Sequence, residues 1–291
     1  MSATARLLPD GRRLHLQHGP IDLVIEAFGP RAAIERAYAR AAAAFPPILP
    51  ALVDELAILR QPLGETPPAV TGPVARRMIA ACWPHRAAFI TPMAAVAGAV
   101  ADAMLRVLTA DGDLARAYVN NGGDIAIQLA DGERLTAGLV ADIAQPALHG
   151  TIGLDSAWPV RGLATSGWRG RSVSRGIADA VTVLAADAAT ADAAATMVAN
   201  AVDIDHPAIR RAPASTVRDD SDLGALPVTV AVGALSDEAV GHALANGRHT
   251  AERLVAAGLI AGAVLVLQGR TCVVPADLPA LAHAPIRESA A

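Results

Sequence analysis

The sequence contains no lysine: all 24 basic residues among its 291 positions are arginine. This absence excludes a lysine Schiff base and a Walker-type phosphate loop, because both need a lysine amine. The two cysteines, Cys82 and Cys272, lie far apart in the chain, so neither a disulfide framework nor a thiolate metal site is supported. A net charge of −4 with scattered arginines argues against a nucleic-acid partner.

Long hydrophobic runs are absent as well. The longest near the C-terminus, Leu259 to Leu267, is too short to span a bilayer, and Met1 to Arg13 has no apolar core or cleavage signal. We therefore expect a cytoplasmic protein with no membrane partner. Hydrophobic residues make up 53% of the chain and charged residues 18%, which is typical of a globular protein. No linker divides the sequence, so we expect one domain over residues 1–291, with a frayed tail at 279–291.

A polar stretch from Tyr118 to Asp124 organises the middle of the chain. Its Gly122-Gly123 pair permits positive φ and lets a ligand approach the backbone with no side chain in the way. Short polar groups from Asn120, Asn121 and Asp124 surround this opening. The stretch is therefore a predicted ligand site, and the alternative is that the two glycines form only a turn or a bulge.

Strand patterns follow this stretch. Residues Ile125 to Leu129 alternate with the period of a half-buried strand. Asp131-Gly132 is typical of a two-residue hairpin turn, so Glu133 to Val140 is predicted to return along that strand. Short strands are also expected at 147–160, 162–165, 180–185, 227–232, 260–268 and 271–274, with an opening hairpin at 14–28.

Helices are predicted between the strands. The segment 30–59 is helical with breaks at 45–47 and Pro50, and a proline-rich loop at 61–73 precedes a short helix at 74–82. Thr91 is expected to cap a helix that runs to Leu108, whose N-terminus can bind an anion. Asp187 and Ser236 are expected to cap helices at 188–202 and 237–258, and 203–222 is predicted to be a long loop. The irregular alternation predicts an α+β (mixed α/β) fold, with a central hairpin-rich sheet flanked by helices.

Three arginines, Arg169, Arg171 and Arg175, lie among glycine and serine in the segment 166–176. Guanidinium groups on such a loop are suited to gripping phosphate. A solvated basic loop without a ligand is the alternative, and the residues alone leave both open.

A polar stripe interrupts the alanine-rich helix predicted at 188–202. Asp192, Thr196 and Asn200 are spaced by four residues and therefore share one helix face. A lone buried carboxylate needs a partner, and an Asp with a Thr one turn later supplies two hard oxygen ligands of the kind that Mg²⁺ prefers. An exposed, narrow polar face is the alternative.

Three segments, in order, resemble the ApbE superfamily, whose characterised members are FAD:protein FMN transferases or flavin-binding relatives. Asn121 to Asp124 is similar to the family's Asn-x-Gly-Gly-Asp region, Ala164 to Gly167 to its Ser-Gly stretch, and Ala191 to Thr196 to its Ala-Asp-Ala-x-x-Thr helix. The resemblance is clear over residues 85–203 and implies an ApbE-like fold. It also implies FAD or FMN as the ligand, and Mg²⁺ held by Asp192 and Thr196.

Two departures from the transferase pattern stand out. In the segment Thr91 to Asp102, Ala97 occupies the position where the transferases carry lysine, although Gly98 and Asp102 match. The His-Ile-Ile-Asp-Pro stretch of the transferases is also missing after the Ser-Gly motif. These departures weaken diphosphate binding and acid–base chemistry as the transferases perform them, and Arg169, Arg171 or Arg175 could replace the missing charge.

We therefore expect a protein that binds a flavin nucleotide or a similar diphosphate ligand with Mg²⁺, with a homodimer left open. The alternatives are an active Mg²⁺-dependent FMN transferase or FAD pyrophosphatase, a non-catalytic accessory protein in sulfur or cofactor assimilation, and a metal-free oligomeric scaffold. The expected ligand residues are Asn120, Asn121, Gly122, Gly123, Asp124, Thr165, Ser166, Gly167, Arg169, Arg171 and Arg175. The expected metal ligands are Asp192 and Thr196, and the pattern assigns no catalytic residue.

Overall fold

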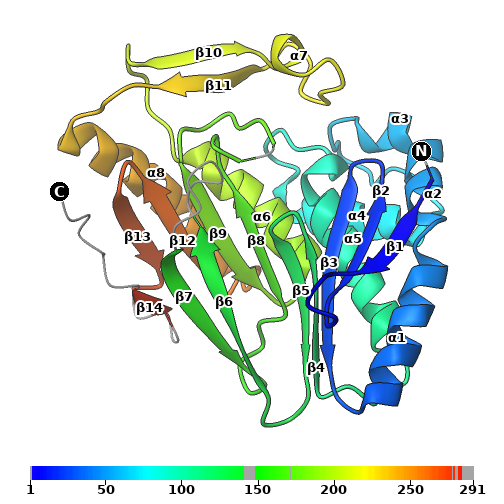
Figure 1. The fold of residues 1–291 in the computed structure, drawn as a ribbon. Helices are drawn as coiled ribbons and strands as arrows, with labels where there is room; N and C mark the ends of the chain where they lie inside the picture. The colour runs from blue at the N-terminus through cyan, green and yellow to red at the C-terminus, as the bar shows by residue number, and fades with distance from the viewer. Residues whose placement is uncertain (1, 141–147, 171, 277, 279–280, 284–291) are drawn as a thin grey trace.

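The core of the protein is a nine-stranded sheet, seen in a computed structural model that describes residues 2–140, 148–170, 172–276, 278 and 281–283 (Figure 1). Every neighbouring pair of strands in it is antiparallel, so the α+β class is confirmed. In spatial order its strands are β1 (Thr4–Leu7), β2 (Leu14–His18), β3 (Ile21–Phe28), β4 (Arg116–Asn121), β5 (Asp124–Leu129), β8 (Gly162–Ser166), β9 (Ala180–Ala185), β12 (Gly262–Leu267) and β13 (Arg270–Val274).

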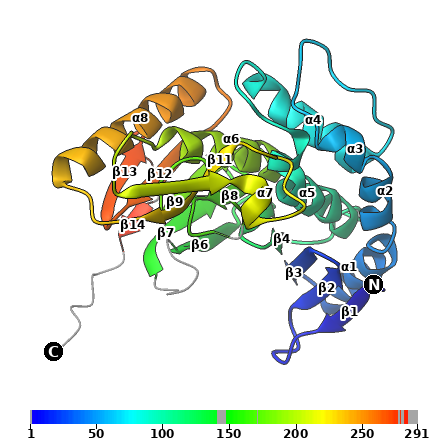
Figure 2. The ribbon, with the colours of Figure 1, turned by 90° about the horizontal axis from the view of Figure 1, so that it is seen from above.

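Helices cover one face of this sheet. Figure 2 shows α4, α5, α6 and α8 on one side, with β6 and β7 on the other. The apolar side chains of β2 to β4 pack with α1, α4 and α5, whereas those of β9 and β12 pack with α6 and α8. The bounds are α1 (Arg31–Ala44), α4 (Pro73–Cys82), α5 (Val96–Leu108), α6 (Ala188–Ala201) and α8 (Asp237–Ala256).

A second, three-stranded sheet covers part of the opposite face. It consists of β6 (Arg134–Val140), β7 (Leu148–Asp155) and β14 (Leu281–His283), and Ile152 and Leu154 pack on Ile127 and Leu163 of the main sheet. The predicted hairpin between β5 and β6 is therefore wrong. Both edges of β5 already pair with β4 and β8, so β6 leaves the main sheet and pairs with β7.

The tail expected at 279–291 is described only in part. Residues 281–283 form β14 and pair with β7, while 279–280 and 284–291 lie outside the described residues. The loop predicted at 203–222 contains β10 (Ile209–Pro213) and α7 (Ala214–Val217), and β10 pairs with β11 (Pro227–Val232). This ribbon lies along the top of Figure 1. The strand expected at 227–232 is confirmed as β11, whereas β10 buries only Ile209 and therefore gives no clear strand pattern.

Two expectations about helix ends, a break at Pro50 and a cap at Thr91, are wrong for local reasons. Pro50 lies in the first turn of α2 (Ile48–Asp54), where a missing N–H breaks no helical bond, and α3 (Leu56–Leu59) follows directly. Thr91 makes no cap, because a 3₁₀ turn (Pro92–Ala95) separates it from α5. By contrast, Asp187 and Ser236 cap α6 and α8 as expected, accepting bonds from Thr190 N (2.8 Å) and Ala239 N (3.2 Å). Over the described residues, no helix has the length and apolarity needed to cross a membrane.

Candidate functional site

The β4–β5 hairpin ends in a tight turn at Gly122-Gly123. Both glycines take positive φ, 68° and 117°, which side chains rarely adopt. Asn120 Oδ1 accepts from Gly123 N (2.8 Å), and Asn121 Nδ2 donates to the carbonyl of Ala97 (3.1 Å). A Cβ atom added to Gly123 meets nothing within 4 Å. The two glycines form a turn, which is both anchored to the start of α5 and open on one side.

Helices α5 and α6 cross at very short range beside this turn. A Cβ on Gly98 would lie 2.2 Å from the carbonyl oxygen of Ala188, so only glycine fits. Asp192 of α6 accepts from Gly98 N of α5 (3.0 Å), and Asp102 of α5 accepts from the N–H groups of Ala188 and Ala189 (3.0 Å each). Each helix thus caps the other. The predicted anion site at the start of α5 holds an anion of the chain itself, the carboxylate of Asp192.

The carboxylates of Asp124 and Asp192 lie close enough at this crossing to repel each other. Burial raises the pKa of Asp124 to about 7, although a bond from Thr165 N (3.2 Å) opposes the shift. Burial, followed by the neighbouring Asp124 carboxylate, raises the pKa of Asp192 well above its usual value. Both side chains nevertheless keep some exposed surface. The two carboxylates are therefore close together and largely buried, where two negative charges are costly without a cation.

The polar stripe of α6 is half-buried rather than an exposed face. Asn200 Oδ1 accepts from Arg175 N (3.0 Å), so Asn200 holds the arginine loop rather than the turn at Gly122-Gly123. Thr196, one turn before it, has no hydrogen-bond partner in the part of the chain that the structure describes. Its hydroxyl is the one group of the stripe that stays available beside Asp192.

The arginine loop divides into separate parts. Arg169 Nε donates to Asp179 (2.7 Å) and its guanidinium lies 4.9 Å from the ring centre of Trp168, so these contacts direct it toward Asp179. The guanidinium of Arg175 lies 5.9 Å from the ring centre of Phe89. Arg171 lies outside the described residues.

In the Ser-Gly segment before this loop, Thr165 is the residue that contacts Asp124. Thr165 contacts Asp124 through its N–H, while its hydroxyl lies 2.8 Å from that of Thr182. Ser166 ends β8 opposite Val181, and Gly167 packs closely on the carbonyl of Asp179. Of the expected ligand residues, the hairpin turn and Thr165 are thus brought together.

Sequence reasoning missed Asp222. Thr91 Oγ1 donates a hydrogen bond to it across 131 positions of the chain. The pKa of the buried Cys82 thiol is raised by burial and then by the charges of Asp192 and Asp222, which places both carboxylates near one thiol. A contact at such separation leaves no local pattern, so only the tertiary structure reveals it.

The fold and these contacts together define an α+β protein with an oxygen-rich candidate site where a glycine hairpin meets two crossing helices. The chain belongs to the family described as "AbpE bacteria", whose model matches residues 5–273. This match confirms the resemblance drawn from the sequence.

Relatives of known sequence carry a different label. The chain is 42% identical over 132 residues to a UPF0280 protein of Methanothermobacter thermautotrophicus, covering 44% of this chain and 48% of that protein. It is 38% identical over 156 residues to a UPF0280 protein of Methanothrix thermoacetophila, covering 53% and 62%. The matched part therefore spans about half the length of these curated relatives.

Solved structures show a more distant likeness. The flavinyl transferase ApbE of Pseudomonas stutzeri, in its apo form, is 14% identical with a TM-score of 0.48, over 94% of this chain and 96% of that one. The flavin transferase ApbE of Vibrio cholerae is 13% identical with a TM-score of 0.39, over 93% and 95%. The flavin transfer in these names belongs to those two proteins.

Proposed function

We propose that the protein binds a flavin nucleotide or a similar diphosphate ligand together with Mg²⁺ at the α5–α6 crossing. The observation that carries the proposal is the pair Asp124 and Asp192. Neither carboxylate has an arginine partner within the described ranges, and each raises the cost of ionising the other. A divalent cation would remove that cost, since it neutralises both charges at once.

The donor set suits Mg²⁺ rather than a softer metal. The available groups are two carboxylates and the hydroxyl of Thr196, all hard oxygen donors. Among the described residues there is no group of three His, Cys, Asp or Glu side chains placed to hold a metal. Mg²⁺ typically keeps several waters and binds one or two carboxylates plus ligand phosphates, so a site completed by a diphosphate fits this arrangement.

The chain's own residues would position such a ligand. The Gly122-Gly123 turn, with Asn120 at its base, leaves backbone open to close approach. Arg175, whose guanidinium lies 5.9 Å from the ring centre of Phe89, would balance phosphate charge. Bound Mg²⁺ would stabilise charge on the phosphoryl oxygens. The proposal stops at binding, because Ala97 stands where the resembling transferases carry lysine.

The test is thermal unfolding with FAD, FMN or ADP, each with and without Mg²⁺. At a ligand concentration of about 100 times Kd, binding adds about 2.7 kcal/mol, which raises Tm by about 5 °C in a chain of this size. Asp192→Ala should abolish the Mg²⁺-dependent part of the shift, and Thr196→Val should reduce it less, since a hydroxyl contributes only a dipole.

Thr190→Val, the same change on the same helix, serves as the control and should behave as the wild type. A nucleotide shift that is identical with and without Mg²⁺, and identical in Asp192→Ala, would rule the metal site out. No shift with any nucleotide would favour the scaffold or accessory alternatives instead.

A further inference from the structure

A second concave site lies near the other end of α5. It is a groove of about 650 Å³ between α1, α2, α4 and α5, and its floor includes Leu52, Val74 and Met104. These three side chains are buried, whereas Ile48 and Val107 at the sides are half-exposed. The volume falls within the range of small-molecule pockets, about 300–1,000 Å³.

Small side chains keep the groove open. Ala51 of α2 and Ala103 of α5 both line it. An apolar surface left uncovered in this way is costly in water, and concave patches of this kind mark binding sites.

The charged residues of the groove define what its ligand carries. Arg40 is occupied at the end of α5, donating to the carbonyls of Val107 (2.7 Å) and Leu108 (3.0 Å). Glu55 is likewise occupied, accepting from Thr71 Oγ1 (3.0 Å) and Gly72 N (3.2 Å). Arg106 is exposed and has no polar partner in the part of the chain that the structure describes. The one uncommitted charge on the groove wall is thus positive.

We propose that this groove binds a long-chain carboxylic acid, with the hydrocarbon chain along the floor and the carboxylate at Arg106. The floor supplies contact with apolar groups only, and Met104 adapts its shape to an unbranched chain. The exposed guanidinium pairs with the acid at the edge, where water still reaches it. This groove does not include Asp124 or Asp192 at the start of α5.

The experiment measures displacement of the fluorescent acid cis-parinaric acid by palmitic acid and by 1-hexadecanol, its uncharged counterpart. Arg106→Gln should weaken the binding of palmitic acid by about three- to fivefold, as expected for the loss of an exposed ion pair. The affinity for hexadecanol should change by less than about twofold. Arg76→Gln, an exposed arginine of α4 outside the groove, should change neither.

Filling the groove provides the second arm. Ala51 is exposed on α2, so Ala51→Trp should fold normally and abolish binding of both the acid and the alcohol. Ala32→Trp, an exposed alanine at the far end of α1, should bind as the wild type. Saturable binding that survives Ala51→Trp, or no saturable binding in the wild type, overturns the proposal. So does a wild-type dimer that Ala51→Trp dissociates, because the groove would then be a contact between copies.

Discussion

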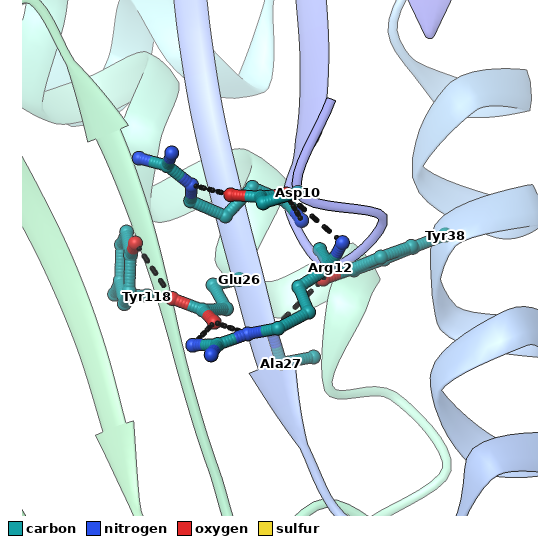
Figure 3. Close-up of polar contacts among 7 residues, drawn as sticks. Asp10, Arg12, Glu26, Ala27, Tyr38 and Tyr118 are labelled. Atoms are coloured by element: carbon teal, nitrogen blue, oxygen red, sulfur yellow. Dashed lines mark hydrogen bonds and ion pairs between the residues drawn. The ribbon is translucent and has the colours of Figure 1, made fainter. Parts of the chain in front are cut away.

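At the scale of single residues, Glu26 is a buried carboxylate on β3 that two polar side chains contact (Figure 3). It accepts from Arg12 Nε (3.0 Å) and from the hydroxyl of Tyr118 on β4 (3.0 Å). Tyr38 of α1 completes the cluster, donating to the carbonyl of Arg12 (2.7 Å) and accepting from Ala27 N (3.1 Å). The cluster ties the β1–β2 connection, the sheet and α1 together.

Tyrosine titration tests this cluster. Burial, and then the bond to Glu26, raises the pKa of Tyr118 to about 12, from an ordinary value of 10. Between these values the folded protein holds a proton that the unfolded chain releases, so stability should fall as pH rises from 10 to 12. The chain has two tyrosines, so tyrosinate absorbance in Tyr38→Phe isolates Tyr118.

In that background Glu26→Gln should lower the Tyr118 pKa toward 10. An unchanged titration curve would show that burial alone sets the pKa and that the hydrogen bond contributes nothing to it.

At the scale of elements, the reciprocal capping of α5 and α6 fixes the candidate site. Asp102 is buried, accepts two N–H groups of α6 and pairs with Arg77 (2.7 Å). Asp187, the residue directly before α6, caps the same helix but stays partly exposed. The two carboxylates therefore serve one helix start in different environments.

Substitution should separate the two. Asp102→Ala leaves two buried N–H groups without their acceptor and removes the closer of the two carboxylates that pair with Arg77, so it should lower the free energy of unfolding by about 2–4 kcal/mol. Asp187→Ala removes an ordinary N-cap and should cost about 1 kcal/mol. Urea denaturation of both variants measures the difference. Equal costs would mean that the crossing relaxes and that Asp102 does not hold it.

Local signals predicted the elements well and their partners less well. Caps such as Asp187 and Ser236 depend on three or four residues, and so does the Gly122-Gly123 turn, which is why sequence reasoning found them. The pairing of β6 depends on whether β5 has a free edge, and that is decided by β8, more than 30 residues further along the chain. A local hairpin signal at Asp131-Gly132 carries no information about it.

At the scale of the whole molecule, the sheet and its helices bring three distant segments together at the start of α5. The hairpin end supplies Asp124, β8 supplies Thr165, and α6 supplies Asp192 and Thr196. Family resemblance singled out all three segments. It could not supply Asp222, because this residue lies in the connection between α7 and β11 and meets Thr91 only through the tertiary structure. The assignment of these residues to a ligand stays a prediction.

The most direct measurement is an anomalous difference map from crystals grown with ADP and Mn²⁺, which takes the same oxygen ligands as Mg²⁺. The account predicts one strong peak between Asp124 and Asp192, within coordination distance of Thr196 Oγ1, with phosphate oxygens completing the metal's coordination. A map with bound ADP and no metal peak at this crossing, or with the peak at another place on the chain, would contradict the central claim.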